Sequence, residues 1–250
     1  MIQAVLDAST EHGSPRYSII IPVFNESEVI AQLLMETREV VRDWPWDYEV
    51  LVIDDGSSDS TPEVIERCFA DWDQGKLIRF RENCGQAAAL YHGMKEARGE
   101  VFILMDGDGQ NDPHDIAKIL ESMDHADMVV GVRLDRRDSF VRRLMSRTAN
   151  KIRSRILNDS ITDSGCGIKA LDREVFDAFI PIRTLYSFMP ALALSAGFTV
   201  KQVPVRHRPR LGGKSKYGVR QFLWRPLLDL LGVWWFTRRR CPAISMQEEK

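Results

Sequence analysis

Two aspartates separated by one glycine, Asp106 and Asp108, stand directly after the apolar run 101–105. Such a run is typical of a buried strand, and two carboxylates at its end would repel each other and be costly to desolvate. A hard divalent cation removes that cost, because Mg²⁺ and Mn²⁺ accept carboxylates and fill their remaining sites with water and phosphate. A plain strand-to-turn junction is the alternative, since Asp-Gly is common in turns. The position after a strand of α/β type favours a metal site.

Two further polar clusters follow apolar runs earlier in the chain. Residues 24–27 come after the run 17–23, and residues 54–59 end the run that begins at 48. Helical patterns at 28–42, 86–98 and 113–123 separate these runs and the shorter ones at 77–81 and 127–132. Strands that alternate with helices predict a parallel, doubly wound sheet. Because the carboxyl ends of its strands share one edge, we expect the three polar clusters to meet there.

Charge divides the chain into two halves. Residues 1–128 carry 10 Lys and Arg against 26 Asp and Glu, whereas residues 129–250 carry 24 against 10. This asymmetry indicates different partners for the two halves. The acidic half suits a cation, and the basic half suits phosphate groups or an anionic membrane. Nucleic acid is not expected as a partner, because no recognised binding motif accompanies the positive charge.

The basic half contains two segments that could bind phosphate, the helix 140–157 and the loop 207–218. Arg143 and Arg147 lie on a predicted helix, 140–157, part of which must be a solvated face. A glycine-punctuated loop, 163–169, precedes a predicted helix at 187–196 and a strand at 198–206. The loop 207–218 then combines glycines with cations, which suits a phosphate-binding loop. A solvated flexible connection is the alternative for that loop.

The segment 221–236 is apolar and aromatic, and Arg238, Arg239 and Arg240 follow it. This pattern predicts an amphipathic helix at an anionic membrane interface, with a core-packing helix as the alternative. We expect no signal peptide and no transmembrane helix, because neither pattern occurs in the sequence. The four cysteines are scattered without a C-x-x-C pair, which favours reduced thiols and a cytoplasmic protein and argues against a zinc site.

Taken together, these motifs resemble those of family-2 glycosyltransferases of the GT-A fold, specifically the polyprenyl- and dolichol-phosphate sugar synthases. The matching stretches are 21–26 (IPVFNE), 54–59 (DDGSSD), 83–86 (NCGQ) with Gly93, 99–110 (GEVFILMDGDGQ), 163–165 (DSG) and 213–217 (GKSKY). The resemblance predicts an α/β domain over 17–218, with a mostly parallel, Rossmann-like GT-A sheet flanked by helices. A flexible lead, 1–16, would precede it, and a C-terminal amphipathic membrane-interface helix and tail, 219–250, would follow it.

The family motifs also assign roles to individual residues. By this resemblance, the donor nucleotide pocket would be lined by Pro22, Asn25, Glu26, Asp55, Gly85 and Asp106. The metal site, for Mg²⁺ or Mn²⁺, would be formed by Asp106, Asp108 and Gln110. Asp108 and Asp163 would be the catalytic residues, with Asp163 on the acceptor side. Lys214, Ser215 and Lys216 would lie on the family's basic acceptor loop and bind the acceptor phosphate. Apart from the resemblance, the basic half offers Arg143, Arg147 and Arg206 as further candidates for binding that phosphate. Cys166 and Lys169 depart from the residues that many relatives have there, namely an apolar residue and an arginine.

The implied activity is inverting transfer of a sugar from a UDP- or GDP-sugar to undecaprenyl or dolichyl phosphate at the cytoplasmic membrane face. Bacterial relatives often carry two C-terminal transmembrane helices, so attachment here is expected to be peripheral or shared with a membrane protein partner. Two alternatives stay open. The acceptor could be a saccharide hydroxyl of a lipopolysaccharide or polysaccharide, with Asp163 as a true base. The chain could also be an inactive scaffold for membrane enzymes, although the intact Asp106 and Asp108 pair argues against that.

Overall fold

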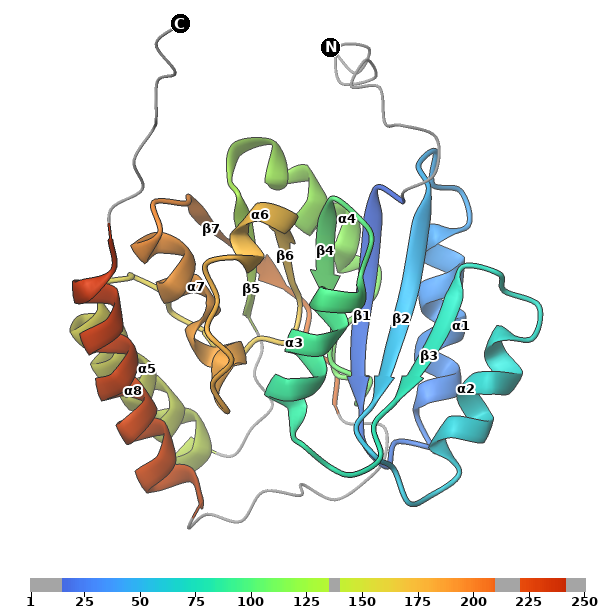
Figure 1. The fold of residues 1–250 in the computed structure, drawn as a ribbon, viewed down its shortest axis with the longest axis horizontal. Coiled ribbons are helices and arrows are strands. Elements are labelled where there is room, and N and C mark those ends of the chain that lie inside the picture. Colours follow the sequence, from blue (N-terminus) through green and yellow to red (C-terminus); the bar gives the residue numbers. More distant parts are fainter. Residues whose placement is uncertain (1–14, 135–139, 210–220, 242–250) are drawn as a thin grey trace, which may run out of the picture.

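The computed structural model describes residues 15–134, 140–209 and 221–241, which form one sheet with helices on both faces (Figure 1). The strands are β1 (Tyr17–Val23), β2 (Tyr48–Asp54), β3 (Gly75–Arg79), β4 (Val101–Leu104), β5 (Met128–Arg133), β6 (Lys169–Asp172) and β7 (Val200–Val205). The helices are α1 (Ile30–Val41), α2 (Thr61–Phe69), α3 (Gln86–Glu96), α4 (Asp115–Glu121), the 3₁₀ turn η2 (Met123–His125), α5 (Phe140–Leu157), α6 (Arg173–Phe176), α7 (Leu185–Ser195) and α8 (Gln221–Arg239). Residues 1–14 of the predicted lead and 210–218 of the basic loop lie outside the described residues.

The sheet is mixed, in the order β3-β2-β1-β4-β6-β5-β7. β1 pairs in parallel with β2 and β4, and β2 pairs in parallel with β3, as the alternating pattern predicts. The expectation of a parallel sheet was wrong for β6, an additional strand that runs antiparallel to both β4 and β5. This strand has only four residues and directly follows the glycine-rich loop, so no periodic signal marked it. The mostly parallel α/β sheet flanked by helices is otherwise confirmed, whereas the membrane-interface role of the C-terminal helix and the domain limits stay predictions.

Alternate residues of the central strands point into two different apolar layers. Ile19 and Ile21 of β1 pack with residues of α1, α2 and α4, whereas Ile20 packs with residues of α3, α7 and α8. Both faces of β1 and β2 are buried, which explains their continuous apolar sequences. Covering helices on both faces leave the ends of the central strands as the place where polar side chains can gather.

Helix α8 lies at the periphery beside α5 (Figure 1). Leu230 and Val233 are buried against the body, and Asp229 accepts a hydrogen bond of 2.6 Å from the Thr184 hydroxyl. A helix at 221–239 therefore exists, and its inward face belongs to the core. Within the described residues, no helix has the length and apolar character needed to cross a membrane.

The close contact between α3 and the sheet yields a stability prediction at Gly93. A Cβ atom built there would lie 2.6 Å from Ile20 Cγ2 and 3.0 Å from Ile53 Cγ1. Gly93→Ala should therefore lower the free energy of unfolding by about 1–2 kcal/mol, because overpacking outweighs the gain in helix propensity. Gly232→Ala is the matched control, since that helical glycine has open space around it and should gain stability. Chemical denaturation measures both, and equal effects would contradict the packing argument.

Candidate functional site

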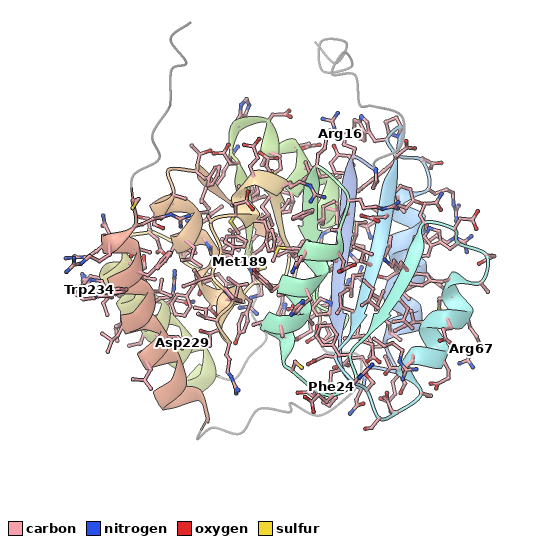
Figure 2. The ribbon with its side chains drawn as sticks, in the orientation of Figure 1. Arg16, Phe24, Arg67, Met189, Asp229 and Trp234 are labelled. Atoms are coloured by element: carbon pink, nitrogen blue, oxygen red, sulfur yellow. The ribbon has the colours of Figure 1, made fainter. Side chains whose placement is uncertain are left out.

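The three predicted polar clusters do meet, because β1, β2 and β4 are parallel neighbours and Gly107 lies against the Pro22 carbonyl at the end of β1. The Asp55 amide donates to the Val23 carbonyl at 2.9 Å, which joins the ends of β1 and β2. Asn25 donates its amide to Ser57 Oγ at 2.8 Å and accepts the Ser58 amide at 2.8 Å. Figure 2 shows Phe24 at this edge and Arg16 at the opposite end of the same strand. The expected convergence is confirmed, and Asn25 holds a left-handed backbone there, with φ of 52°.

Asp55 organises the loop that leads into α3. Its carboxylate accepts hydrogen bonds from the Cys84 amide at 2.7 Å, the Gly85 amide at 2.8 Å and Asn83 Nδ2 at 2.9 Å. Burial raises the pKa of Asp55, while the two backbone hydrogen bonds oppose that rise. Gly85 has φ of 94°, which favours glycine. Asp55 and Gly85 thus form one unit of the proposed donor pocket, and Pro22 and Glu26 lie at the neighbouring end of β1.

Asp106 and Asp108 follow β4 in the environment that a cation site requires. Burial and the charge of Asp108 raise the pKa of Asp106 to about 6, although Lys169, Arg133 and a hydrogen bond from Gln86 oppose the rise. That hydrogen bond joins Gln86 Nε2 to Asp106 Oδ1 at 2.7 Å. Asp108 Oδ1 accepts the Gln110 amide at 3.1 Å. A divalent cation would relieve the repulsion between the two carboxylates, so the residues fit a metal.

Few protein ligands are available for that metal. Among the described residues, no group of three His, Cys, Asp or Glu side chains is arranged to hold a cation. Mg²⁺ commonly uses one or two carboxylates and completes its shell with water and substrate phosphates. Asp106, Asp108 and the amide oxygen of Gln110 therefore suit a metal that binds together with a diphosphate.

The predicted metal motif, residues 106–110, is reached from the basic half of the chain by the end of β7. The Arg208 amide donates to the Gln110 carbonyl at 2.9 Å, and Asn111 and His207 form an isolated antiparallel bridge. Arg206, a predicted phosphate ligand, donates its amide to Asp115 at 2.6 Å and has a side chain that is 75% exposed. Its guanidinium lies 3.6 Å from Asp112. Arg206 is therefore exposed to solvent and close to the loop 106–112, which is called the metal loop below.

The predicted acceptor-side aspartate, Asp163, is engaged by a residue that the sequence analysis missed. Arg133 Nε and Nη2 each donate to the Asp163 carboxylate at 2.7 Å. Burial acts to lower the pKa of Arg133, but its hydrogen bond and charge interaction with Asp163 outweigh burial and raise that pKa. Arg133 ends β5 at the same edge as the polar clusters, and this position is the signal that could have identified it.

Lys169 is a buried cation beside the metal motif. Its Nζ donates to the Cys166 carbonyl, and burial lowers its pKa while the carboxylate charges of Asp106 and Asp163 oppose that change. Burial also raises the pKa of the Cys166 thiol to about 11, so this cysteine is a neutral core group. A Cβ atom on Gly167 would lie 2.1 Å from Asp106 Oδ2, so only glycine allows this close approach. Gln86, Arg133 and Lys169 are thus the site neighbours that sequence reasoning did not select.

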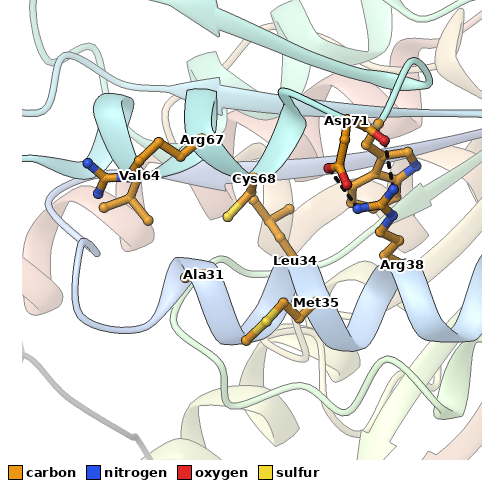
Figure 3. Close-up of a pocket in the computed structure, with 9 residues that line it drawn as sticks. Ala31, Leu34, Met35, Arg38, Val64, Arg67, Cys68 and Asp71 are labelled. Atoms are coloured by element: carbon orange, nitrogen blue, oxygen red, sulfur yellow. Dashed lines mark hydrogen bonds and ion pairs between the residues drawn. The ribbon is translucent and has the colours of Figure 1, made fainter.

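Of two cavities in the structure, one adjoins Asp106 and the other lies away from it. One of about 50 Å³ adjoins the metal motif, and its lining includes Gln86, Asp106, Gly167, Lys169 and Tyr186. Another of about 310 Å³ lies between α1 and α2, where Arg38 pairs with Asp71 (Figure 3). Its lining residues come from α1, α2 and the turn after α2, so it does not adjoin the metal motif.

The remaining predicted phosphate ligands are not placed by contacts. Arg143 and Arg147 belong to α5, in a part of the helix whose side chains lie outside the described residues. Lys214, Ser215 and Lys216 fall in the segment 210–220, which is also outside the described residues. These five residues therefore stay predictions.

Solved structures of sugar-transferring enzymes share this fold. Glucosyl-3-phosphoglycerate synthase from Mycobacterium tuberculosis, in complex with Mn²⁺, UDP-glucose and phosphoglyceric acid, superposes with a TM-score of 0.67 at 16% identity, over 88% of this chain and 80% of that one. A mannosyltransferase from Pyrobaculum calidifontis, in complex with GDP-mannose and Mn²⁺, gives 0.63 at 19% identity, over 95% and 68%. At these identities the likeness establishes the GT-A-type architecture.

The sequence defines the family more narrowly. Residues 18–179 match the model of glycosyl transferase family 2, and the chain belongs to that family. Curated relatives include undecaprenyl-phosphate 4-deoxy-4-formamido-L-arabinose transferases from two bacteria. The protein from Pseudomonas fluorescens (strain SBW25) is 34% identical over 216 residues, which are 86% of this chain and 63% of the relative. The one from Edwardsiella ictaluri is 33% identical over 208 residues, or 82% and 64%. The chain thus spans a little under two thirds of their length.

The electrostatics of Asp106 predict a pH-dependent stability effect. Its folded pKa of about 6 lies above its ordinary value of 3.8, so its stabilising contribution is present below pH 4 and is lost as the pH rises through 6. Asp106→Asn should therefore stabilise the ligand-free protein at pH 7.5, on the order of 1–3 kcal/mol, with little effect near pH 4. Thermal unfolding across this pH range, with and without Mn²⁺ and UDP or GDP, measures the effect.

Asp172 provides the matched control, because burial and the charges of Asp127 and Glu174 raise its pKa to about 6 as well. Asp172→Asn should show the same pH pattern and keep the stabilisation by Mn²⁺ and nucleotide, which Asp106→Asn should lose. Equal ligand stabilisation in both variants would contradict the assignment of the metal site.

Proposed function

We propose that this chain is a metal-dependent, inverting glycosyltransferase that moves a sugar from a UDP- or GDP-sugar to a polyprenyl phosphate at the cytoplasmic face of a membrane. The observation that carries the proposal is the meeting of the Asp106 and Asp108 pair with cations from the basic half at one sheet edge. The named activity of the curated relatives supports the acceptor class. The nucleotide sugars bound by the structural neighbours support the donor class.

The reaction needs two phosphate-bearing substrates at one site. An oxygen of the acceptor phosphate attacks the anomeric carbon, the bond from that carbon to the nucleotide diphosphate breaks, and the diphosphate leaves with the electron pair. A metal held by Asp106, Asp108 and Gln110 would supply Lewis-acid stabilisation of this leaving group. Asp55 and the amides around Gly85 would hold the donor pocket in shape. Attack from the opposite side inverts the anomeric configuration.

A phosphate acceptor agrees with the geometry around Asp163. A lipid monophosphate has a second pKa near 6, so it is largely ionised at neutral pH and requires no strong base. Arg133 directs two hydrogen bonds at the Asp163 carboxylate, so these oxygens are engaged by a guanidinium. A saccharide hydroxyl would instead need a base with accessible lone pairs. In this proposal Asp163 therefore holds Arg133 in place at the acceptor side.

Cations would bind the acceptor phosphate. Arg206 is exposed beside the metal loop, and the segment that contains Lys214, Ser215 and Lys216 begins a few residues later. Arg143 and Arg147 would add charge from α5. Charge-assisted hydrogen bonds from several such residues could hold the acceptor phosphate near the donor diphosphate in spite of their repulsion.

The outer face of α8 supports attachment to a membrane surface. Leu228, Leu231 and Trp235 are 69%, 52% and 59% exposed, and their spacing places them along one side of the helix. Arg238 and Arg239 continue that side in the last turn. Because Leu230 and Val233 fix the opposite side to the core, the apolar side faces outward. Such a face suits the headgroup region of an anionic bilayer, with or without a membrane protein partner.

The activity is tested by incubating the full chain and Mn²⁺ with undecaprenyl or dolichyl phosphate and a panel of UDP- and GDP-sugars. The panel includes 4-deoxy-4-formamido-L-arabinose donors, and mass spectrometry detects the product. Asp108→Asn should reduce transfer by at least 100-fold while thermal unfolding shows an intact fold, because the leaving-group charge is no longer neutralised. Transfer only to the free hydroxyl of a prenol or saccharide would contradict the proposed acceptor.

Membrane attachment is tested by flotation with anionic and neutral liposomes. Arg238→Gln with Arg239→Gln should weaken binding to anionic vesicles roughly 30-fold, because each basic residue contributes about 1 kcal/mol. Leu231→Ser with Trp235→Ser should weaken binding to both vesicle types. Met35→Ser is the control, since Met35 is 64% exposed on α1, away from α8. Unchanged flotation of both double variants would remove the membrane role of α8.

A further inference from the structure

Arg208 joins three elements of the candidate site. Its guanidinium pairs with Glu36 of α1 through Nη1 and with Asp112 through Nη2, the latter at 2.8 Å. Its backbone amide donates to the Gln110 carbonyl at 2.9 Å. The side chain is 27% exposed, so most of it is enclosed by these partners. One residue therefore ties the end of β7 to the metal loop 106–112 and both of them to α1.

Both carboxylates that pair with Arg208 are largely shielded from solvent. The Asp112 side chain is 6% exposed, and it also accepts the His114 amide at 3.1 Å and contacts His114 Nδ1 at 2.8 Å. Glu36 is 21% exposed. A nearly buried carboxylate is costly without a close cation, and Arg208 at 2.8 Å is nearer to Asp112 than Arg206 at 3.6 Å, so Arg208 is its main ionic partner. Asp112 lies two residues after Gln110, which connects this ion pair to the proposed metal ligands.

We propose that Arg208 is a positioning residue, which holds the cationic end of β7 at a fixed distance from the metal loop. This inference rests on the proposed function for its effect on turnover. Asp106, Asp108 and Gln110 belong to the acidic half of the chain, whereas Arg206 belongs to the basic half. Reaction requires the groups that bind the two phosphates to be aligned within a fraction of an ångström. Glu36 anchors this arrangement to a helix that is packed in the core.

The fork geometry of arginine is the distinguishing feature. Two separate carboxylates are bound through two different nitrogens, which the single ammonium group of lysine cannot reproduce. Arg208→Lys keeps the charge and loses the fork, whereas Arg208→Met loses both. If the position of the end of β7 depends on the contacts of both guanidinium nitrogens, the Lys and Met variants should show the same changes. Glu36→Gln probes the same contact from α1.

The experiment measures two readouts on the full chain. Hydrogen exchange at the Arg208 amide should become at least 10-fold faster in Arg208→Lys and Arg208→Met, because the bond to Gln110 is no longer held. The kcat for transfer to polyprenyl phosphate should fall about 10-fold in both, while the Kd for Mn²⁺ with UDP or GDP changes less than twofold. Glu36→Gln should lower kcat about threefold alone and add nothing in the Arg208→Met background.

Arg38→Met is the matched control. Arg38 of α1 is also an ion-paired arginine, but it pairs with Asp71 and stacks over Trp72, both in the turn after α2. It should leave both readouts unchanged. A parental kcat in Arg208→Lys, or additive effects of Glu36→Gln and Arg208→Met, would overturn the positioning role. If the parent transfers no sugar, the proposed function fails, and unchanged exchange at the Arg208 amide in the variants would then overturn the inference independently.

Discussion

Asp106 carries its carboxylate at the end of a strand whose preceding residues are buried on both faces. Together with Asp108 it concentrates negative charge where solvation is poor. The free-energy cost of this charge raises its pKa to about 6. The surrounding residues reduce the cost only in part: Gln86 donates a hydrogen bond, and Lys169 and Arg133 contribute positive charge. A divalent cation, bound together with a diphosphate, would neutralise the negative charge that these neighbours leave uncompensated. Such a local stability cost is common at ligand-binding sites.

The antiparallel strand β6 explains how the two halves of the chain supply one site. By entering between β4 and β5, it places Lys169 directly beside the strand that carries the metal motif. The preceding turn brings Gly167 so close to Asp106 that a side chain would not fit. β5 then delivers Arg133 to the same edge, and β7 delivers Arg206 and Arg208. The acidic half therefore provides the carboxylates, and the basic half provides their counter-charges.

Much of this arrangement could be predicted from local patterns. The strands β1, β2 and β4 are continuous apolar runs, and the polar residues at their ends follow from one rule about parallel sheets. β6 was missed because its four residues, KALD, form neither a continuous apolar run like that of β4 nor a stretch long enough to display a period. Arg133 was missed although the same rule applies to the end of β5. The Arg208 contacts depend on Glu36, 172 residues away in sequence, and no local pattern contains that information.

The roles assigned to single residues also changed when their partners were known. From sequence, Asp163 could act as a base or only position the acceptor. Its two short hydrogen bonds to Arg133 favour a positioning role, because a carboxylate that binds a guanidinium through both oxygens fixes a cation in place. Helix α8 packs Leu230 in the core, as the core-packing alternative expects, and leaves Trp235 exposed, whereas its place at a membrane interface stays a prediction. An outward apolar face fixed to the catalytic body would keep the sheet edge in a constant orientation to the membrane. A lipid-linked phosphate could then meet the cations without leaving the bilayer.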